Sequence, residues 1–383
     1  MAIHFALEEF TDRKSKVVKE LKKQNLDALL MFRQESMYWL TGYDTFGYVY
    51  FQCLILTVNG DLVLLTRVPD LRQAQNTSII KDIRIWVDQD KANPAMELKN
   101  ILSELGLEKS NLGVEYEAYG LTGKNAIRLN NSLKSFATLH DKSELVSFLR
   151  VIKSDAEIVF IKKAAKLADN AMEVAWKYAC AGQNEAKILA EMQRTIFEGG
   201  GDYPANAFII GSGKNALLCR YQSEKRKLDD IDQLSLEWAG TYKHYHSCLF
   251  RTILIGKENN KQKKMHAACV KALSLCEKKL KSGNKAGDVF DAHVEVFDSL
   301  GYKKSRMNAC GYSLGSTFSP NWMDWPMLYN GNPITLAPGM VFFIHMILMD
   351  SENQLAMNLG ETYLITEEGN ERLGKKKLDL VIC

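Results

Sequence analysis

The chain has 383 residues, of which 46% are hydrophobic and 25% charged, and its formal net charge is +3. This length allows two domains, and the composition is that of an ordinary soluble globular protein. Acids and bases nearly balance, so we expect neither a nucleic acid nor a membrane surface as a partner. We find no uninterrupted apolar stretch of the roughly 18 residues that a membrane span needs.

The eight cysteines are scattered along the chain without a CxxC pair. This spacing argues against a disulfide framework or a zinc knuckle and favours a reducing compartment. The segment Met1–Phe5 lacks a basic stretch followed by a long apolar run, so a secretory signal is not expected there. We therefore expect a cytoplasmic protein.

Residues 1–145 alternate helical and strand patterns, which predicts an α/β domain with a mixed sheet. An amphipathic pattern predicts a helix over Phe10–Gln24, and an apolar run predicts a buried strand over Leu26–Phe32. Asn59–Gly60 between two apolar runs indicates a hairpin. Further strands are expected at Phe51–Leu56, Leu62–Thr66, Ile83–Val87, Leu112–Val114 and Ser135–Thr138, and further helices at Pro94–Leu105 and Leu121–Leu133.

The pattern changes after Lys142–Ser154, which we interpret as a connector. Long helices and antiparallel-looking strands then predict an α+β domain over residues 150–383. The expected helices are Asp155–Cys180, Asn184–Phe197, Lys261–Leu280 and Ala286–Leu300, and the expected strands are Ala207–Gly211, Leu234–Trp238, His244–Ile255, Met340–Met349 and Glu361–Thr366.

Several strings resemble motifs of the methionine aminopeptidase/prolidase/creatinase family. Arg150–Glu157 resembles the "R-x-x-K-s-x-x-E" that opens its first long helix, and Tyr245–Thr252 resembles its "YHSDxTRT" strand. Ala337–Ile344 resembles "xPGMVFTI", and Glu361–Gly369 resembles the closing "EDTVLVTExG". The resemblance implies a pita-bread C-terminal domain. Tyr38–Tyr43 resembles the α/β creatinase/prolidase-type N-terminal domain that precedes it.

Three further strings, Gly200–Ala205, Lys243–His246 and Trp39–Asp44, look most like the ectoine hydrolase branch, a metal-free relative of creatinase. This resemblance implies hydrolysis of a non-peptide C–N bond in a small molecule. The Phe46–Tyr48 loop resembles the part of creatinase that enters the neighbouring subunit's active site. A homodimer in which each N-terminal domain lies near the partner's site is therefore expected.

Metal-dependent members of the family bind two divalent ions through two Asp, one His and two Glu. The resemblance maps these ligands onto Glu237, Cys248, Tyr312, His345 and Gly360, of which only Glu237 is a carboxylate. Hard or borderline cations require anionic oxygens, so we expect no metal and no other cofactor. Glu237, Cys248 and His345 are nevertheless residue types that suit zinc, and a rebuilt zinc site stays an alternative.

Hydrolysis without a Lewis acid needs an electrophilic substrate or an activated nucleophile. Creatine and ectoine are already cationic at the carbon that is attacked, and a remaining carboxylate would bind such a group by a charge-assisted hydrogen bond. Glu237 is the first candidate, either as the amidinium partner or as a general base. The alternative for Glu237 is a structural ion pair with Arg251 or Lys243. Glu361, next to a lost ligand position, is the second candidate.

Histidines supply the other candidate catalytic groups. His345 replaces a ligand, and a pKa near neutrality would suit it to proton transfer. His246 and His244 alternate with Tyr245 along a predicted strand and so face one side, where structural hydrogen bonding and catalysis are both open.

Arg220 lies where the branch has a histidine that acts on the substrate. Arginine does not exchange protons near neutral pH, but it binds a carboxylate bidentately. Cys248 is also expected to contact the substrate. Aromatic residues expected around the pocket, able to cage an organic cation, are Tyr203, Trp238, Tyr312, Trp322, Trp325 and, from the N-terminal domain, Phe46 and Tyr48.

These observations favour a metal-independent hydrolase of a small cationic osmolyte that bears a carboxylate, with ectoine or a creatine-like compound as substrate. Two alternatives remain open at this point. One is a lyase that acts on a sulfonium or betaine osmolyte. The other is a non-catalytic osmolyte-binding protein that has kept the pita-bread fold.

Overall fold

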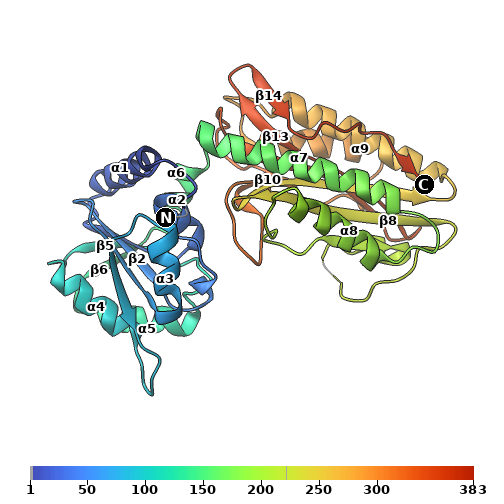
Figure 1. The fold of residues 1–383 in the computed structure, drawn as a ribbon. Coiled ribbons are helices and arrows are strands. Elements are labelled where there is room, and N and C mark those ends of the chain that lie inside the picture. The colour runs from blue at the N-terminus through green and yellow to red at the C-terminus, as the bar shows by residue number, and fades with distance from the viewer. Residues whose placement is uncertain (1–2, 221) are drawn as a thin grey trace. The chain divides into compact units, whose positions relative to one another are not determined.

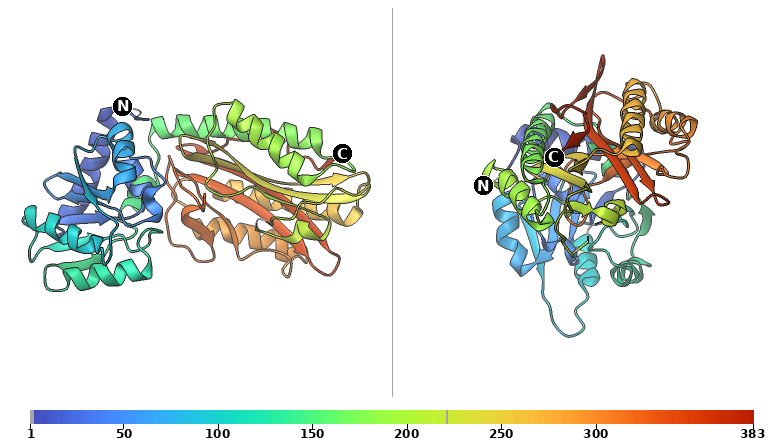
Figure 2. Two further views of the ribbon diagram at one scale, coloured as in Figure 1. Left: turned by 60° about the horizontal axis from the view of Figure 1, so that its bottom comes forward. Right: turned by 90° about the vertical axis from the view of Figure 1, so that its right-hand side faces the viewer.

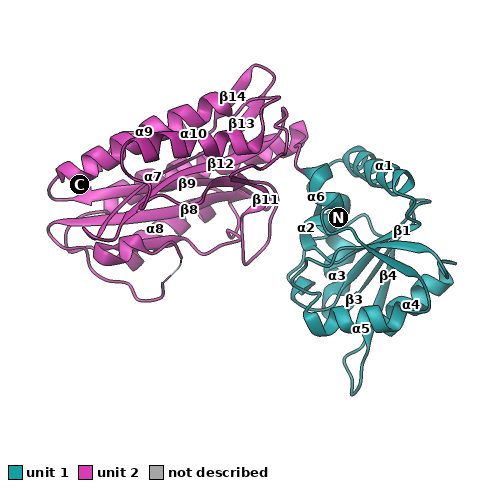
Figure 3. Cartoon of the chain, turned by 180° about the vertical axis from the view of Figure 1, so that it is seen from behind, with its two compact units in different colours: residues 1–150 teal, residues 151–383 magenta. Residues whose placement is uncertain are grey.

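The computed structural model describes residues 3–220 and 222–383, and the chain forms two compact units, residues 1–150 and 151–383 (Figure 3). The division lies in the segment that we expected to be a connector. That segment is partly helical, because Leu145–Arg150 form α6. None of the helices in the described part of the chain combines the length and the apolar composition that a membrane span requires.

Unit 1 is built on a mixed sheet with the strand order β4-β3-β2-β1-β5-β6 (Figure 1). Strand β1 runs parallel to β5 and antiparallel to β2, and the Asn59–Gly60 hairpin joins β2 to β3 as predicted. The strands are β1 (Ala28–Met31), β2 (Cys53–Thr57), β3 (Leu62–Arg67), β4 (Asp82–Trp86), β5 (Asn111–Val114) and β6 (Thr138–Asp141). The helices are α1 (Leu7–Lys23), α2 (Gln34–Thr41), α3 (Val68–Thr77), α4 (Pro94–Glu104), α5 (Gly123–Leu133) and α6.

Unit 2 places four long helices on a large sheet with the path β11-β10-β12-β13-β9-β8-β7, to which β14 and β15 add (Figure 1). The helices are α7 (Asp155–Tyr178), α8 (Glu185–Glu198), α9 (Asn260–Lys279) and α10 (Ala286–Ser299). The strands are β7 (Ile209–Ser212), β8 (Asp232–Tyr242), β9 (Tyr245–Ile255), β10 (Ala309–Ser313), β11 (Asp324–Tyr329), β12 (Val341–Asp350), β13 (Leu355–Thr366), β14 (Gly369–Arg372) and β15 (Val381–Ile382).

The start of α7 explains the first family-like string in physical terms. The Ser154 hydroxyl accepts a hydrogen bond from the Glu157 N–H at 3.3 Å, and a Glu157 carboxylate oxygen accepts one from the Ser154 N–H at 2.9 Å. This reciprocal capping box satisfies two N–H groups that a helix start leaves unpaired. The other Glu157 oxygen accepts from the Tyr245 hydroxyl at 2.7 Å, which ties α7 to β9.

Helices cover one face of the unit 2 sheet. Helix α7 packs along β8 and β9, and α9 along β12 and β13 (Figures 1 and 2). The indole of Trp238 in β8 donates to the Ala168 carbonyl oxygen of α7 at 3.0 Å, and Ile344 of β12 belongs to a core that includes Phe297 of α10. Side chains alternate along a strand, so Glu237 and His345 point to the opposite face.

The β8–β9 hairpin corrects one predicted boundary. Lys243 and His244 both have positive φ, 51° and 63°, and they form the two-residue turn between paired Tyr242 and Tyr245. Such a turn matches the right-handed twist of the flanking strands. We predicted that His244 begins the strand, whereas β9 begins at Tyr245.

Candidate functional site

The residues that the resemblance maps onto metal-ligand positions meet on the face of the sheet that lies away from the helices. Glu237 in β8 pairs in register with Phe250 in β9, Phe250 pairs with Gly360 in β13, and Gly360 pairs with His345 in β12. Directly opposed residues share a face, so this row runs across four strands. Tyr312 in β10 pairs with Phe343, the neighbour of His345 on the same face.

The sheet curves toward this face. Four strand steps separate β10 from β8, and a flat sheet would place these strands about 19 Å apart. The Tyr312 hydroxyl nevertheless donates a hydrogen bond to Glu237 Oε1 at 3.2 Å. Extended tyrosine and glutamate side chains together do not span the flat distance, so the face that carries Glu237 is concave.

Strand β10 has a bulge next to Tyr312. The register of β10 against β11 shifts between Ala309 and Gly311, so that Cys310 has no opposite partner there. Such a bulge re-aims the side chains that follow it. Glycine is needed at position 311 because a Cβ would lie only 2.2 Å from the Phe343 carbonyl oxygen.

Glu237 is a buried carboxyl group with a strongly perturbed pKa. Its side chain is 9% exposed, and this burial raises its pKa from 4.5 to about 7. The hydrogen bond from Tyr312 and the positive charge of Arg220 oppose the rise, because both favour the ionised form. A carboxyl group poised near neutral pH is suited to general base catalysis.

Two of the predicted substrate-binding residues accompany Glu237. Arg220 is exposed on the loop before β8, where its Nη1 donates to the Cys219 carbonyl oxygen at 2.8 Å, and its charge reaches Glu237. Cys248 lies on the same face of β9, fully buried. Burial and the charge of Glu237 both raise the pKa of the Cys248 thiol well above its usual value, so it stays protonated.

His345 lies in an aromatic setting that our expectation did not include. Its ring centroid is 5.7 Å from that of Tyr312 and 5.5 Å from that of Phe343, and its Nδ1 has no hydrogen-bond partner among the described residues. Burial lowers its pKa to about 4. The imidazole is therefore neutral at pH 7, and the near-neutral pKa that we expected is wrong.

His246 is fully buried and its two ring nitrogens are both engaged. Nε2 accepts from the Ala205 N–H at 2.9 Å, so Nδ1 carries the proton and donates to the Thr317 hydroxyl at 3.2 Å. Burial lowers the pKa of His246 to about 3. Of the two roles left open by the sequence, this geometry favours a structural one.

Glu361 lies on the other side of the sheet. It is the next residue after Gly360, so the alternation of β13 turns its side chain to the helix-covered face. There it is fully buried in an ion pair with Arg251, whose Nη1 also donates to the Gly360 carbonyl oxygen at 2.8 Å. Our placement of Glu361 in the site is corrected, as is the ion pair between Glu237 and Arg251.

Trp238 also faces away from the site, in its hydrogen bond to Ala168. Tyr203 is 81% exposed and makes an edge contact with Phe197, with ring centroids 4.8 Å apart. His244 in the hairpin turn stacks on Phe318 at 4.3 Å. The structure therefore brings none of these three expected substrate contacts to Glu237.

Phe46 and Tyr48 belong to unit 1, where their rings contact each other with centroids 5.7 Å apart. Phe46 is 71% exposed and Tyr48 is buried. The loop that carries them is held by a hydrogen bond of 2.5 Å from the Thr45 hydroxyl to Asp70 Oδ1. Their expected role in a second subunit's site stays a prediction.

Two aromatic residues at the site were less visible from the sequence. Trp322 was only one of several loop aromatics, yet its indole N–H donates to the Tyr312 hydroxyl at 2.9 Å. Phe343 was missed. The available signal was that phenylalanine stands where the family-like string "PGMVFTI" has threonine.

Comparisons with known proteins identify the family. Residues 160–367 match the model of metallopeptidase family M24, and residues 13–152 match that of the creatinase/prolidase N-terminal domain. The chain belongs to metallopeptidase family M24. Both parts of the predicted architecture, the pita-bread domain and the N-terminal domain before it, are confirmed.

Individual relatives cover nearly the whole chain. The ectoine hydrolase of Halomonas elongata is 27% identical over 97% of this chain and 97% of its own. The Xaa-Pro dipeptidase of Pyrococcus horikoshii is 24% identical over 97% and 99%. Among solved structures, the prolidase from Thermococcus sibiricus matches with a TM-score of 0.88 at 21% identity, covering 98% and 99% of the two chains.

The family name implies a metal ion, but the residues of this chain do not form the ligand set. The Tyr312 hydroxyl is hydrogen-bonded to Glu237 and Trp322, and Gly360 has no side chain that could bind a metal ion. A Cβ at Gly360 would lie 2.6 Å from the Phe343 ring, so this ring fills the space beside the lost ligand. Among the described residues, no group of three or more His, Cys, Asp or Glu is placed to hold a metal ion, which also argues against the rebuilt zinc site.

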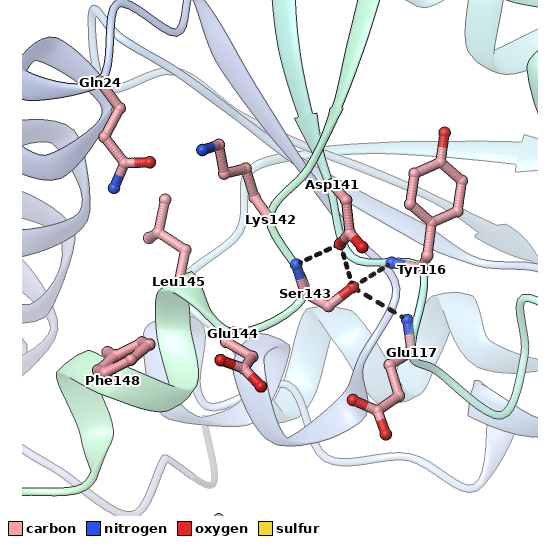
Figure 4. Close-up of a pocket in the computed structure, with 9 residues that line it drawn as sticks. All are labelled: Gln24, Tyr116, Glu117, Asp141, Lys142, Ser143, Glu144, Leu145 and Phe148. Atoms are coloured by element: carbon pink, nitrogen blue, oxygen red, sulfur yellow. Dashed lines mark hydrogen bonds between the residues drawn. The ribbon is translucent and has the colours of Figure 1, made fainter. Parts of the chain in front are cut away.

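A separate cavity of about 670 Å³ lies in unit 1 (Figure 4). Several of its polar groups are hydrogen-bonded to one another. The Ser143 hydroxyl accepts hydrogen bonds from the Tyr116 and Glu117 N–H groups and donates one to Asp141 at 2.6 Å. The remaining lining residues are Gln24, Lys142, Glu144, Leu145 and Phe148. The cavity contains none of the family-like strings that carry the site.

Proposed function

We propose that this protein is a hydrolase that cleaves a C–N bond of a small cationic, carboxylate-bearing compound without a metal ion, with the cyclic amidine ectoine as the best substrate candidate. The observation that carries the proposal is Glu237. A lone buried carboxyl group with a pKa of about 7 stands where the family has metal ligands. The likeness to the ectoine hydrolase of Halomonas elongata supports the same substrate class.

Glu237 in its ionised form would act on water as a general base. It takes a proton from the water that attacks the amidinium carbon, and the new C–O bond creates a tetrahedral intermediate. When the C–N bond breaks, both protons of the consumed water end on the leaving nitrogen, one of them carried by Glu237. For ectoine the product is N-acetyl-diaminobutyrate.

A cationic substrate suits this site better than a metal ion does. The amidinium group already supplies the electrophilic carbon that a Lewis acid would otherwise create. Its charge would also offset the cost of ionising the buried Glu237 carboxyl group. Arg220, whose charge already reaches Glu237, would bind the carboxylate of the same substrate.

The proposal includes a homodimer in the cytoplasm. Phe46, Val49 and Tyr50 lie within one five-residue segment and are all exposed, at 71%, 39% and 50%, and exposed apolar side chains gathered in this way support contact with a second copy. All eight cysteines are free thiols, as a reducing compartment favours.

The test is incubation of the purified full chain with ectoine, after dialysis against a chelator, with N-acetyl-diaminobutyrate followed by NMR. We expect product from the wild-type protein and a loss of about a hundredfold or more in kcat for Glu237→Gln. Failure to convert ectoine and creatine would overturn the substrate assignment. Parallel incubations with a sulfonium osmolyte, a betaine and an Xaa-Pro dipeptide identify a lyase or a peptidase, and saturable binding without turnover identifies a binding protein.

A further inference from the structure

A directed series of hydrogen bonds ends on Glu237. The indole N–H of Trp322 donates to the Tyr312 hydroxyl oxygen at 2.9 Å, and the Tyr312 hydroxyl donates to Glu237 Oε1 at 3.2 Å. Trp322, Tyr312 and Glu237 are all buried, with exposures of 2%, 4% and 9%.

The direction of this series follows from the chemistry of its members. An indole N–H is a donor only, so the tyrosine oxygen must accept from it. The single phenolic proton of Tyr312 is then directed to the carboxylate. The arrangement is the same whether Glu237 is ionised or protonated on its other oxygen.

We infer that Oε2 of Glu237 is the atom that exchanges a proton with water and substrate, and that Tyr312 and Trp322 are positioning residues that reserve Oε1 and hold the carboxylate plane. This assignment rests on the proposed function, in which Glu237 is the general base. It goes further because it assigns different roles to the two oxygens of Glu237. It also gives Trp322 a role that is exerted through Tyr312.

The loop that carries Trp322 is itself held from the same face of the sheet. The Thr317 hydroxyl accepts from His246 Nδ1 at 3.2 Å and donates to the Trp322 carbonyl oxygen at 3.4 Å. His246 in turn accepts from the Ala205 N–H. His246, a neutral and fully engaged imidazole, thus supports the tryptophan rather than the chemistry.

Tyr312 is not itself suited to proton exchange. Burial and the neighbouring Glu237 raise the pKa of its phenol well above 10. Besides Tyr312, the group that acts on the pKa of Glu237 is Arg220, and the thiols of Cys219 and Cys248 are near enough for the charge of Glu237 to act on them. Both thiols also have raised pKa values, so at neutral pH Arg220 is the one charged side chain in this set besides Glu237 itself.

The experiment measures the ionisation of Glu237 directly, by infrared titration of protein labelled with ¹³C in its glutamate carboxyl groups, with the Glu237→Gln spectrum subtracted. Tyr312→Phe removes a hydrogen bond to the ionised form, so we expect its midpoint to rise by about half a pH unit or more. Trp322→Phe weakens the tyrosine as a donor and should give a smaller rise in the same direction. The double variant should match Tyr312→Phe alone, because Trp322 acts through Tyr312.

Trp238→Phe is the matched control. Trp238 lies on β8 beside Glu237, but its indole hydrogen bond is on the opposite face of the sheet. The substitution should lower thermal stability and leave the midpoint unchanged. The inference is overturned if Trp322→Phe leaves the midpoint at the wild-type value, or if its shift adds fully to that of Tyr312→Phe. The titration needs no substrate, so a failure of ectoine hydrolysis would be distinguishable from a failure of this assignment.

Discussion

Tyr312 and Glu237 are joined by a hydrogen bond although four strand steps separate β10 from β8. The bond crosses the concave face between the two halves of the sheet in unit 2. The Glu237 carboxyl group on β8 and the Tyr312 phenol on β10 both stand at positions that the resemblance maps onto metal ligands. The hydrogen bond therefore links two such positions directly.

Stability should depend on pH through Glu237. Its pKa is about 7 in the folded protein and 4.5 in the unfolded chain, so the folded state binds more protons between these values. Stability therefore falls as pH rises from about 4.5 to 7. Glu237→Gln removes this loss. The free energy of unfolding of the variant minus that of the wild type should therefore be larger at pH 8 than at pH 4.5, by on the order of 3 kcal/mol.

Urea unfolding of both proteins at several pH values measures this difference. Glu115 in unit 1 also has a pKa raised to about 7 by burial, but it is present in both proteins and cancels. An equal stability difference at pH 4.5 and pH 8 would contradict the assigned burial of Glu237.

The rate of turnover should rise with pH, because the ionised form of Glu237 is the base. The lower limb of the kcat/KM profile, which reports the free enzyme, is expected near pH 7. Arg220 lowers the pKa of Glu237, so Arg220→Gln should move this limb upward and also raise KM for carboxylate-bearing substrates, whereas Arg220→Lys keeps the charge and should move the limb less. A lower limb that is unchanged in Arg220→Gln would remove Arg220 from the site.

Glu361 should affect stability rather than turnover. Its carboxylate is fully buried against Arg251, and removing one member of a buried pair leaves the other charge uncompensated. We expect Glu361→Gln to cost about 3 kcal/mol of unfolding free energy, with kcat/KM per folded molecule within about twofold of the wild type. The double variant Glu361→Gln/Arg251→Gln should recover part of the loss. A large fall in kcat/KM with stability intact would return Glu361 to the site.

Local signals in the sequence predicted the elements well where they had a clear period or a cap. The Asn59–Gly60 hairpin forms as expected, and the helix expected from Asp155 begins at that residue, behind a capping box at Ser154 and Glu157. Helix α2 was not predicted, because nearly every residue in Gln34–Thr41 is buried and no amphipathic stripe exists. Strands β10 and β11 were missed as well, and the register shifts in their pairing interrupt the alternation that marks a strand.

The sequence could predict which strand positions contribute to the site, but not which side chains meet there. Matching the family-like strings located Glu237, Tyr312 and His345, which the structure does bring to one face. Glu361 and Gly360 face opposite sides of the sheet because successive side chains of β13 alternate. A resemblance read position by position does not include this alternation. The approach of Trp322 to Tyr312 depends on how a loop folds back, and no periodic pattern records that.

The space beside Gly360 allows a test of whether the Phe343 ring occupies the room that a side chain at position 360 would need. A Cβ there would lie 2.6 Å from the Phe343 ring and 2.9 Å from Phe250 Cβ, so Gly360→Ala should destabilise the protein by about 1–3 kcal/mol through overpacking. Phe343→Thr, which restores the residue of the family-like string, opens a cavity and is expected to be destabilising by itself.

The combined variant Gly360→Ala/Phe343→Thr should cost clearly less than the sum of the two single changes, because the new methyl group occupies space that the ring has left. Chemical denaturation of the wild type and the three variants gives this interaction energy. Gly182→Ala is the control, since no atom of the described residues lies within 4 Å of a Cβ at that position and its φ is +77°. Its cost therefore comes from the backbone alone and should add fully to that of Phe343→Thr. Full additivity of Gly360→Ala and Phe343→Thr would show that Phe343 does not fill the space of the lost ligand.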